Sequence, residues 1–471
     1  MTMVDDNKKE VSTELVKKAD FVFEVSWEVC NKVGGIFTVV KSKAARMKEH
    51  YGENYFLVGP YFVNKAAGQF EEGLCPEYAK PAIDALRKEG IECHYGKWII
   101  EGEPNVILID FTNFAGRKND IKTEFWKNFG IDSLTTQYFD YDEPIVWSYA
   151  VGRVIHEFSK LKNAKIVAHF HEWLAAGGLL YLKQNNVKVA TVFTTHATIL
   201  GRTIASSGRD LYAVMQNIDP DKEAFSFGIQ AKYLTEKAAA NKVDVFTTVS
   251  EITGLEATYL LKKSPDVILP NGLDMSKFPT MEEASIKHKL FKRKIYEFMQ
   301  YYFFPYYSFD LEETLFYFIC GRYEFRDKGI DIFIKALSKL NEVMKKQKSK
   351  KTVVAFFWIP GNIKGIKASL LENKTLFQDI RDSVTDDLDD LKTNIINDFV
   401  SKIDIKKETL LPQETLSELR VKINKFSKKG NPPLSTHDLY NEDDDDIIKA
   451  FKHHGLDNSK DSPVKVVFYS I

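Results

Sequence analysis

Short apolar runs rich in β-branched residues recur along this chain, and each is followed by a turn and an amphipathic stretch. Strands that are apolar at almost every position are typical of a parallel sheet covered on both faces. Between the runs, apolar residues recur with helical spacing at 145–161, 234–240 and 251–263. This alternation predicts a doubly wound α/β fold. The strands predicted in the first half of the chain are 21–25, 106–109, 165–170, 189–193 and 243–247.

A second α/β series begins after a break near 270–272, where Pro, Asn and Gly follow one another. The stretch 281–309 is first charged and then aromatic, and we interpret it as a helical connector. Strands are predicted at 315–319 and 353–357, with a helix at 329–345 between them. We therefore expect two α/β domains. The predicted limits are 1–275 for the first domain, 276–312 for the connector and 313–471 for the second domain.

The composition changes from 361 to about 462, where Lys, Asp, Glu, Leu and Asn dominate with helical spacing. We interpret this part as helical, with a loop at 430–433. The acidic run 443–446 is interpreted as the start of a solvated helix, which the helix dipole stabilises. A strand follows at 464–469, and a doubly wound domain that ended there would keep an open edge and a bare face. We therefore expect the natural chain to continue beyond Ile471.

Composition argues against several classes of function. The 471 residues carry 65 Lys and Arg against 66 Asp and Glu, a formal charge of -1. A balanced chain lacks the basic excess that binding to nucleic acid or to a membrane surface needs. The segment 1–20 is polar and charged, unlike a signal peptide, and no apolar run reaches the ~18 residues of a membrane span. Four isolated cysteines indicate reduced thiols in a cytoplasmic protein rather than disulfides or a zinc site; they are Cys30, Cys75, Cys93 and Cys320.

Unusual loops follow several of the predicted strands, which is where open α/β sheets bind their ligands. The first loop holds Lys32, Gly34 and Gly35, between a strand and a helix. Paired glycines allow the backbone to approach a ligand closely, and the N-terminus of the following helix attracts anions. A tight turn without a ligand explains this loop equally well.

The second loop contains His169, His171 and Glu172, a pattern that first suggests a metal site. Two histidines separated by one residue on a strand share one face. No third ligand is evident in the sequence, so we predict no metal here. The favoured interpretation is a strand-end turn in which Trp173 packs.

The third loop, 194–202, contains His196 and Arg202 directly after a buried strand. The guanidinium group is a planar fork of donors that suits a diphosphate. The alternative is a surface arginine that caps a turn.

The fourth loop places Arg322 at the tip of a buried strand and Lys328 at the start of the next helix. Two cations in these positions are unfavourable unless an anion fills the gap between them. Each charge-assisted hydrogen bond to such an anion contributes roughly 1.5–3 kcal/mol. The alternative is that Lys328 is simply solvated. Two α/β domains with such loops suggest a phosphate-bearing ligand held between them.

In order along the chain, these loops resemble those of the animal and fungal glycogen synthases, glycosyltransferase family 3. The resemblance implies a GT-B fold, in which two Rossmann-like domains flank the active site and the second carries a helical insertion. It implies transfer of glucose from UDP-glucose to the non-reducing 4-hydroxyl of an α-1,4-glucan, with retention of configuration. It implies neither a metal nor a cofactor. The matching strings lie at 24–36, 167–175, 193–202, 244–250, 269–273, 321–325 and 328–329.

The resemblance also implies roles for individual residues. Arg202, Arg322 and Lys328 would bind the donor diphosphate and stabilise the negative charge that develops as UDP leaves. His196 would lie beside the transferred glucose, and the loop at 32–35 would lie near the donor. These four side chains are therefore the expected catalytic residues.

Regulation and assembly in the family give further expectations. His288 and Lys292 loosely match positions near the site for the activator glucose 6-phosphate, and the arginine cluster that answers to this activator would lie beyond Ile471. The helical insertion is expected to form contacts of a homotetramer in the full-length protein. A glycogenin-like primer protein is a further expected partner.

Departures from the family pattern keep two other functions open. The Glu-x7-Glu motif is absent from the 471 residues, and Phe225, Ser226 and Ala231 replace residues that are usually Gly, basic and His. One alternative is a non-catalytic glucan-binding or scaffold relative. The other is a GT-B glycosyltransferase with a different nucleotide-sugar donor. We expect the 471-residue chain by itself to be inactive and poorly soluble.

Overall fold

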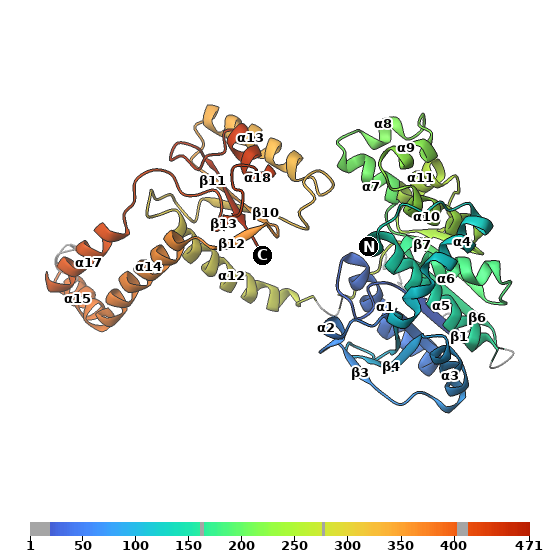
Figure 1. The fold of residues 1–471 in the computed structure, drawn as a ribbon. Helices are drawn as coiled ribbons and strands as arrows, with labels where there is room; N and C mark the ends of the chain where they lie inside the picture. The colour runs from blue at the N-terminus through green and yellow to red at the C-terminus, as the bar shows by residue number, and fades with distance from the viewer. Residues whose placement is uncertain (1–18, 161–163, 276–277, 403–412) are drawn as a thin grey trace, which may run out of the picture. The chain divides into compact units, whose positions relative to one another are not determined.

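The chain forms two compact units in the computed structural model, Met1–Phe278 and Pro279–Ile471 (Figure 1). Each unit has a sheet of its own with apolar cores packed against it. The predicted domain limits remain a prediction, and residue 276 lies outside the described part of the chain. The structure describes residues 19–160, 164–275, 278–402 and 413–471.

The sheet of the first unit has nine strands in the order β3-β4-β5-β2-β1-β6-β7-β8-β9. All neighbouring strands are parallel except at the two pairs that involve β4. This confirms the predicted α/β class, and the predicted strands of this half fall on β1, β5, β6, β7 and β8. The strands are β1 (Phe21–Val25), β2 (Tyr55–Pro60), β3 (Phe70–Glu72), β4 (Glu92–Trp98), β5 (Asn105–Asp110), β6 (Ile166–His171), β7 (Ala190–Thr195), β8 (Val245–Thr248) and β9 (Val267–Ile268).

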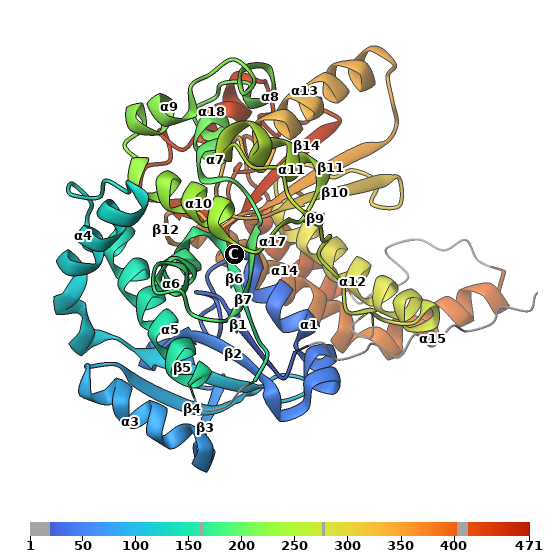
Figure 2. The same cartoon turned by 90° about the vertical axis from the view of Figure 1, so that its right-hand side faces the viewer.

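Helices cover both faces of this sheet, which explains why its central strands are apolar at nearly every position. Successive side chains of β1 point to opposite faces. Phe23 and Val25 enter the larger core, which includes α5 (Glu143–Ser159) and α6 (Glu172–Gln184). Val22 enters the core formed with α1 (Gly35–Tyr51). Figure 2 shows α6 and α1 on opposite sides of the strands.

The predicted helices of this unit are present with shifted ends. The helix predicted at 145–161 is α5, and the last residue of that prediction lies outside the described residues. The helix predicted at 251–263 is broken into α11 and a π-helical turn, η5. The other elements are α2 (Val63–Ala66), α3 (Lys80–Lys88), α4 (Lys118–Phe129), α7 (Ile199–Ser206), α8 (Leu211–Val214), α9 (Pro220–Ser226), α10 (Gln230–Lys242), α11 (Glu251–Glu256), η1 (Gly52–Asn54), η2 (Glu77–Ala79), η3 (Thr112–Arg117), η4 (Tyr138–Asp142) and η5 (Ala257–Leu261).

The sheet of the second unit has three parallel strands in the order β10-β11-β14, and all three were predicted. Helices α13 and α18 pack on one face, while the end of α12 packs on the other. The stretch expected to be a connector is therefore helical and contributes to the core of this unit. The elements are α12 (Met281–Tyr302), β10 (Thr314–Cys320), α13 (Ile330–Lys346), β11 (Thr352–Trp358), α18 (Asp446–His453) and β14 (Val464–Tyr469).

Between β11 and β14 the chain forms helices, as predicted, but it also forms an antiparallel strand pair that the sequence reading missed. Helix α14 packs against both α12 and α17. Figure 1 shows α14, α15 and α17 gathered away from the three-stranded sheet of their unit. Residues 403–412 of this stretch lie outside the described residues. The elements are β12 (Ile363–Ile366), α14 (Ala368–Asp386), α15 (Leu388–Val400), α17 (Gln413–Phe426) and β13 (His437–Leu439).

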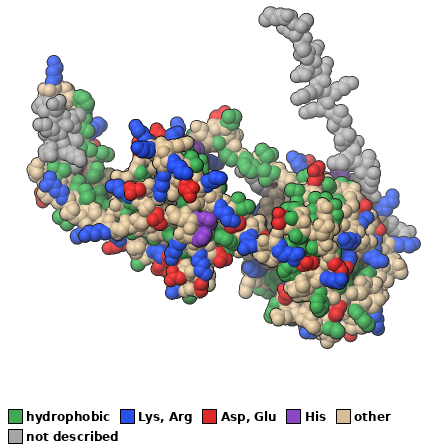
Figure 3. Space-filling model, turned by 90° about the horizontal axis from the view of Figure 1, so that it is seen from above, with side chains coloured by type: hydrophobic (Ala, Val, Ile, Leu, Met, Phe, Trp, Pro, Cys, Tyr) green, Lys and Arg blue, Asp and Glu red, His purple; other side chains and the backbone are tan. Residues whose placement is uncertain are grey.

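The acidic run and the surface charge follow the sequence expectations. Asp445 begins α18 by accepting hydrogen bonds from the amides of Ile447 and Ile448, both at 3.0 Å. Side chains of both charges are interspersed over the face in Figure 3, in line with the formal charge of -1. Among the described helices, none combines the length and the apolar character needed to cross a bilayer.

Candidate active site at the carboxyl edge of the first sheet

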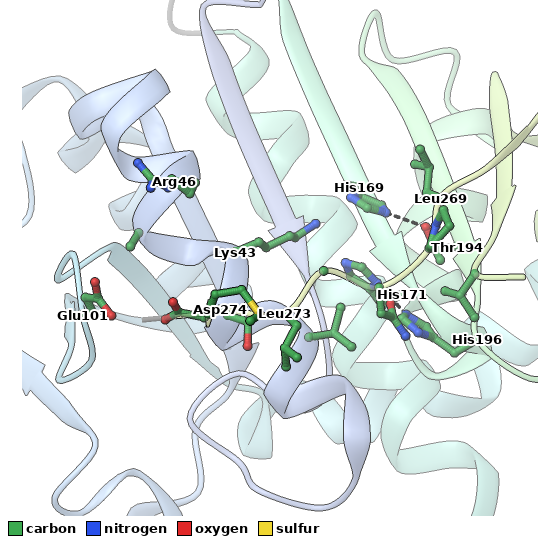
Figure 4. Close-up of a pocket in the computed structure, with 18 of the residues that line it drawn as sticks. Lys43, Arg46, Glu101, His169, His171, Thr194, His196, Leu269, Leu273 and Asp274 are labelled. Carbon is green, nitrogen blue, oxygen red and sulfur yellow. Dashed lines mark hydrogen bonds between the residues drawn. The ribbon is translucent and has the colours of Figure 1, made fainter. Parts of the chain in front are cut away.

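The order of strands in the first unit reverses between β1 and β6. The chain places β2 and β5 on one side of β1, and β6, β7 and β8 on the other. Open α/β sheets bind ligands outside the carboxyl ends of the strands at such a reversal. A cavity of about 780 Å³ lies there, and its lining includes Lys43 and Arg46 of α1, His171 of β6, His196 and the segment 269–275 (Figure 4).

A buried carboxylate lies directly behind two residues that line this cavity, Lys43 and His171. Glu24 of β1 is fully buried, and its Oε1 lies 2.5 Å from the Lys43 ammonium and 2.8 Å from Nε2 of His171. The Tyr55 hydroxyl donates to its Oε2. Burial alone would raise the pKa of Glu24, but Lys43 and His171 hold it well below the usual range. Glu24 is therefore a stable anion in the centre of the sheet.

Burial disfavours the charged form of the three histidines beside Glu24. His171 lies 3.0 Å from His196, measured from Nδ1 to Nε2, and Nε2 of His169 lies 2.7 Å from the Thr194 hydroxyl. Burial lowers the pKa of all three rings, and it brings that of His196 to about 3. The rings of His169 and His171 are 4.2 Å apart, which confirms that they share one face of the strand. The cavity lining thus combines these buried imidazoles with charged side chains such as Lys43 and Arg46.

Three of these side chains are close enough together to be considered as ligands of one metal ion. Glu24, His169 and His171 each present one polar atom, and these atoms lie within 4.8 Å of one another. The sequence reading missed Glu24 as a third candidate because it lies far away in the chain. The Lys43 ammonium lies 2.5 Å from Glu24, so this carboxylate already has a positively charged partner. The prediction about Trp173 is confirmed, since this side chain is buried and stacks on Tyr141.

Three further buried carboxylates hold the loop between β7 and α7. Glu172 accepts from the amides of His196 and Ala197 at 2.8 and 3.1 Å. Glu236 accepts from the amide of Ile199 at 3.0 Å, and Glu256 accepts from the hydroxyl of Thr198 at 2.8 Å. Burial raises the pKa of Glu172 to about 7, and it raises those of Glu236 and Glu256 as well. The backbone around His196 is therefore fixed independently of its imidazole ring.

Arg202 lies one helical turn after this loop, on the exposed side of α7. Its positive charge opposes the rise in pKa at Glu172 and Glu256. The structure thus brings His196 and Arg202, which the sequence reading singled out, close to the same group of acids.

The helix that follows the glycine loop after β1 is capped by a side chain of the protein, Glu28. The amides of Gly34 and Phe37 both donate to Oε2 of Glu28, at 2.8 Å each. A carboxylate therefore occupies the N-terminus of α1, where the sequence reading expected a ligand anion. Lys32 is exposed in this loop, and Gly35 is the first residue of the helix.

The predicted cations of the second unit also have a protein partner. Glu324 lies between them, 3.0 Å from the Arg322 guanidinium and 3.7 Å from the Lys328 ammonium. This carboxylate is the anion that the sequence reading expected in the gap, so the two cations alone do not require a ligand. Both side chains are exposed.

The two loosely matched residues of α12 differ in their surroundings. His288 is exposed, and Lys292 is half-buried and pairs with Glu312 at 3.3 Å. The Lys292 ammonium also lies 5.0 Å from the centre of the Tyr296 ring. Lys292 is thus engaged within its own unit.

The family model and the sequence relatives agree on one family. The model of the family described as glycogen synthase matches residues 24–470. The mouse liver glycogen [starch] synthase is 35% identical over 452 residues, which cover 95% of this chain and 64% of that protein. The Dictyostelium discoideum glycogen [starch] synthase is 37% identical over 472 residues, covering 99% of this chain and 53% of that protein. The chain spans less than two thirds of the length of both relatives.

A solved structure gives a weaker likeness. The α,α-trehalose 6-phosphate synthase of Burkholderia multivorans covers 96% of this chain and 72% of its own, with 9% identity and a TM-score of 0.41. That score is too low to establish a shared arrangement. The sequence matches are decisive, since they run through every loop described above. The chain belongs to the glycogen synthase family.

Proposed function

We propose that the protein transfers glucose from UDP-glucose to the non-reducing 4-hydroxyl of an α-1,4-glucan, with retention of configuration. The observation that carries this proposal is the unbroken family match from 24 to 470, joined to relatives that bear the name glycogen [starch] synthase. The cavity at the strand-order reversal supports it, because that is where open α/β sheets bind ligands. The imidazoles of its lining offer hydrogen-bonding groups that a sugar hydroxyl could use.

In this proposal, Arg202, Arg322 and Lys328 bind the donor diphosphate. The diphosphate would compete with Glu324 for Arg322 and Lys328. These two cations would then exchange a carboxylate for a more highly charged partner. The loop at 32–35 would lie near the donor, and His196 beside the transferred glucose. The cations would then stabilise the charge that develops on the leaving UDP.

The proposed reaction needs only the donor, the acceptor and these side chains. The bond between C1 of glucose and the phosphate oxygen breaks, and a bond forms between C1 and the acceptor oxygen on the same face. The departing phosphate takes the proton of the acceptor hydroxyl, so charge and atoms balance. Exclusion of water from the site prevents hydrolysis of the donor.

The partners and the compartment are part of the proposal. The protein acts in the cytoplasm on glycogen, which a glycogenin-like protein primes. Helices α14, α15 and α17 contribute contacts of a homotetramer. His288 and Lys292 contribute to a site for glucose 6-phosphate, which Lys292 would enter by leaving Glu312.

Replacing Arg322 tests the proposal. Transfer of radiolabelled glucose from UDP-glucose to glycogen is measured with the protein of the complete reading frame. We expect Arg322→Ala to lower the rate at least ~100-fold, through the loss of about 3 kcal/mol of transition-state stabilisation. Arg326→Ala, an exposed arginine of the same loop, is the matched control and should retain the wild-type rate. An undiminished rate in Arg322→Ala would refute the assignment.

Two assays separate the alternatives. Competition among UDP-, ADP- and GDP-glucose would reveal a different donor. Binding of glycogen without turnover of any donor would indicate a scaffold relative instead.

A further inference from the structure

Three side chains form a hydrogen-bonded row that ends at the cavity, which we call the Glu24 row: Glu24, His171 and His196. Figure 4 shows its two histidines side by side at the cavity. They come from β1, from β6 and from the loop after β7, so the row crosses neighbouring strands at the carboxyl edge of the sheet. Each of its two hydrogen bonds needs one donor and one acceptor. The positions of the protons therefore follow once one end of the row is known.

The protonation state is established first at the Glu24 end of the row. Its carboxylate lies 2.5 Å from the Lys43 ammonium and also accepts from the Tyr55 hydroxyl. An ionised carboxylate can only accept hydrogen bonds. The contact of 2.8 Å between Glu24 and Nε2 of His171 therefore requires that Nε2 carries a proton.

The next step depends on the charge of His171. Lys43 already neutralises Glu24, so a second cation beside it would be buried without an anion of its own. His171 is almost completely buried, and this burial lowers its pKa. A neutral imidazole with its proton on Nε2 has a lone pair on Nδ1. His171 thus accepts at Nδ1, and the contact of 3.0 Å places a proton on Nε2 of His196.

We propose that Glu24 and His171 are positioning residues that fix His196 as its Nε2–H tautomer, so that Nδ1 of His196 accepts a hydrogen bond from a hydroxyl of the bound sugar. Within the described residues, no protein group hydrogen-bonds Nδ1 of His196, and His196 lines the cavity. A lone pair attracts a hydroxyl donor and repels a phosphate oxygen. The row thus selects the sugar over the diphosphate at this point of the cavity. The identity of the sugar rests on the proposed function, whereas the tautomer does not.

A purely structural role explains the row less well. The loop that carries His196 is already held by Glu172 and Glu236 through its backbone amides. Its position therefore does not require a hydrogen bond to the imidazole. What the row adds is the orientation of the ring and the position of its proton.

The first test reads the protons directly. Nitrogen-15 correlation spectra of the histidine-labelled protein of the complete reading frame distinguish the two tautomers, and the signals lost in His196→Gln identify His196. We expect His171 and His196 both to carry the proton on Nε2. A proton on Nδ1 of His196, or a doubly protonated ring, would overturn the proposal. Neither outcome depends on catalysis.

The second test uses a conservative pair of variants at Glu24. Glu24→Gln keeps an acceptor for His171 and should preserve the tautomer of His196. Glu24→Leu removes the acceptor, and we expect His196 to populate both tautomers. In the protein of the complete reading frame, Glu24→Leu should lower kcat about tenfold with little change in the KM for UDP-glucose, and Glu24→Gln should restore most of the loss.

The matched control is Glu124→Gln, because Glu124 is a half-buried hydrogen-bonded acid of α4 outside the cavity lining. It should leave both the spectrum and the kinetics unchanged. A single His196 tautomer in Glu24→Leu would contradict the role of Glu24. Predicted tautomers in a protein that transfers no glucose would refute the proposed function alone.

Discussion

At the scale of single residues, the loop before α7 is held by Glu172, an acid whose pKa is raised by burial. Burial raises the pKa of Glu172 to about 7, against an ordinary value of 4.5. Such a group binds its proton more tightly in the folded state than in the unfolded state. The free energy of unfolding therefore falls as pH rises from the ordinary value towards 7. We expect Glu172→Gln to flatten this fall, because an amide oxygen can still accept from His196 and Ala197.

Thermal unfolding of the 471-residue chain between about pH 5 and pH 8 measures this effect. Glu236 has a raised pKa as well, so part of the fall should persist in the variant. Glu124→Gln should follow the wild-type curve. A fall in Glu172→Gln as steep as in the wild type would show that Glu172 is not the responsible acid.

A single contact also explains why position 34 is a glycine. A Cβ atom at this position would lie 3.0 Å from Oε1 of Glu28, the acid that caps α1. We expect Gly34→Ala to displace this carboxylate and to lower the free energy of unfolding by about 1 kcal/mol. Gly35→Ala is the control, because its Cβ would meet nothing within 4 Å. Equal denaturant midpoints for the two variants would argue against the contact.

The sequence reading found residues of the loops, among them Glu172, but it did not single out Glu24, Glu236 or Glu256 beneath them. It noted His169 and His171, whereas Lys43 and Tyr55 carry no local signal and reach Glu24 only through the fold. Glu24 did leave a signal, since it is the one charge within an apolar strand. A charge in such a strand calls for a buried partner, and that rule would have found it.

At the scale of elements, β10 is an edge strand with apolar side chains in solvent. No described strand pairs with its free side, and Phe318 is 65% exposed. An unpaired strand edge with apolar side chains pairs readily with a strand of another chain. We expect the 471-residue chain to self-associate, in keeping with its expected poor solubility, and Phe318→Lys to reduce this association severalfold in light scattering.

Phe225→Lys is the matched control for that experiment, because Phe225 is 71% exposed on helix α9 rather than on a strand. It introduces the same charge without blocking an edge. Equal effects of the two substitutions would indicate a general effect of charge and not pairing through β10.

Element prediction succeeded for most of the continuous apolar runs, but it missed β2, whose six residues are all buried, and β4. All three strands of the sheet β10-β11-β14 were found, because each is a continuous apolar run. The strands β3 and β9 have three and two residues and leave almost no pattern. The pair β12 and β13 was missed because it lies at the ends of a stretch with strong helical spacing.

At the scale of the whole molecule, the α/β class was predictable from periodicity, while the family came from motifs in the loops. The spacing argument at Arg322 and Lys328 assumed an external anion, and Glu324 supplies one from within the same loop. Local charge counting could not decide between a ligand and a neighbouring acid. The matching strings along the chain identify the family, and the ligand of these two cations stays a prediction.

The central claim is that this protein extends α-1,4-glucans from UDP-glucose. The direct test supplies the protein of the complete reading frame with glycogen and radiolabelled UDP-glucose, and then digests the product with β-amylase. We predict label in the glycogen that β-amylase releases as maltose, with UDP formed in equal amount. Glycogen without label, or label that enters only from another sugar nucleotide, would contradict the claim.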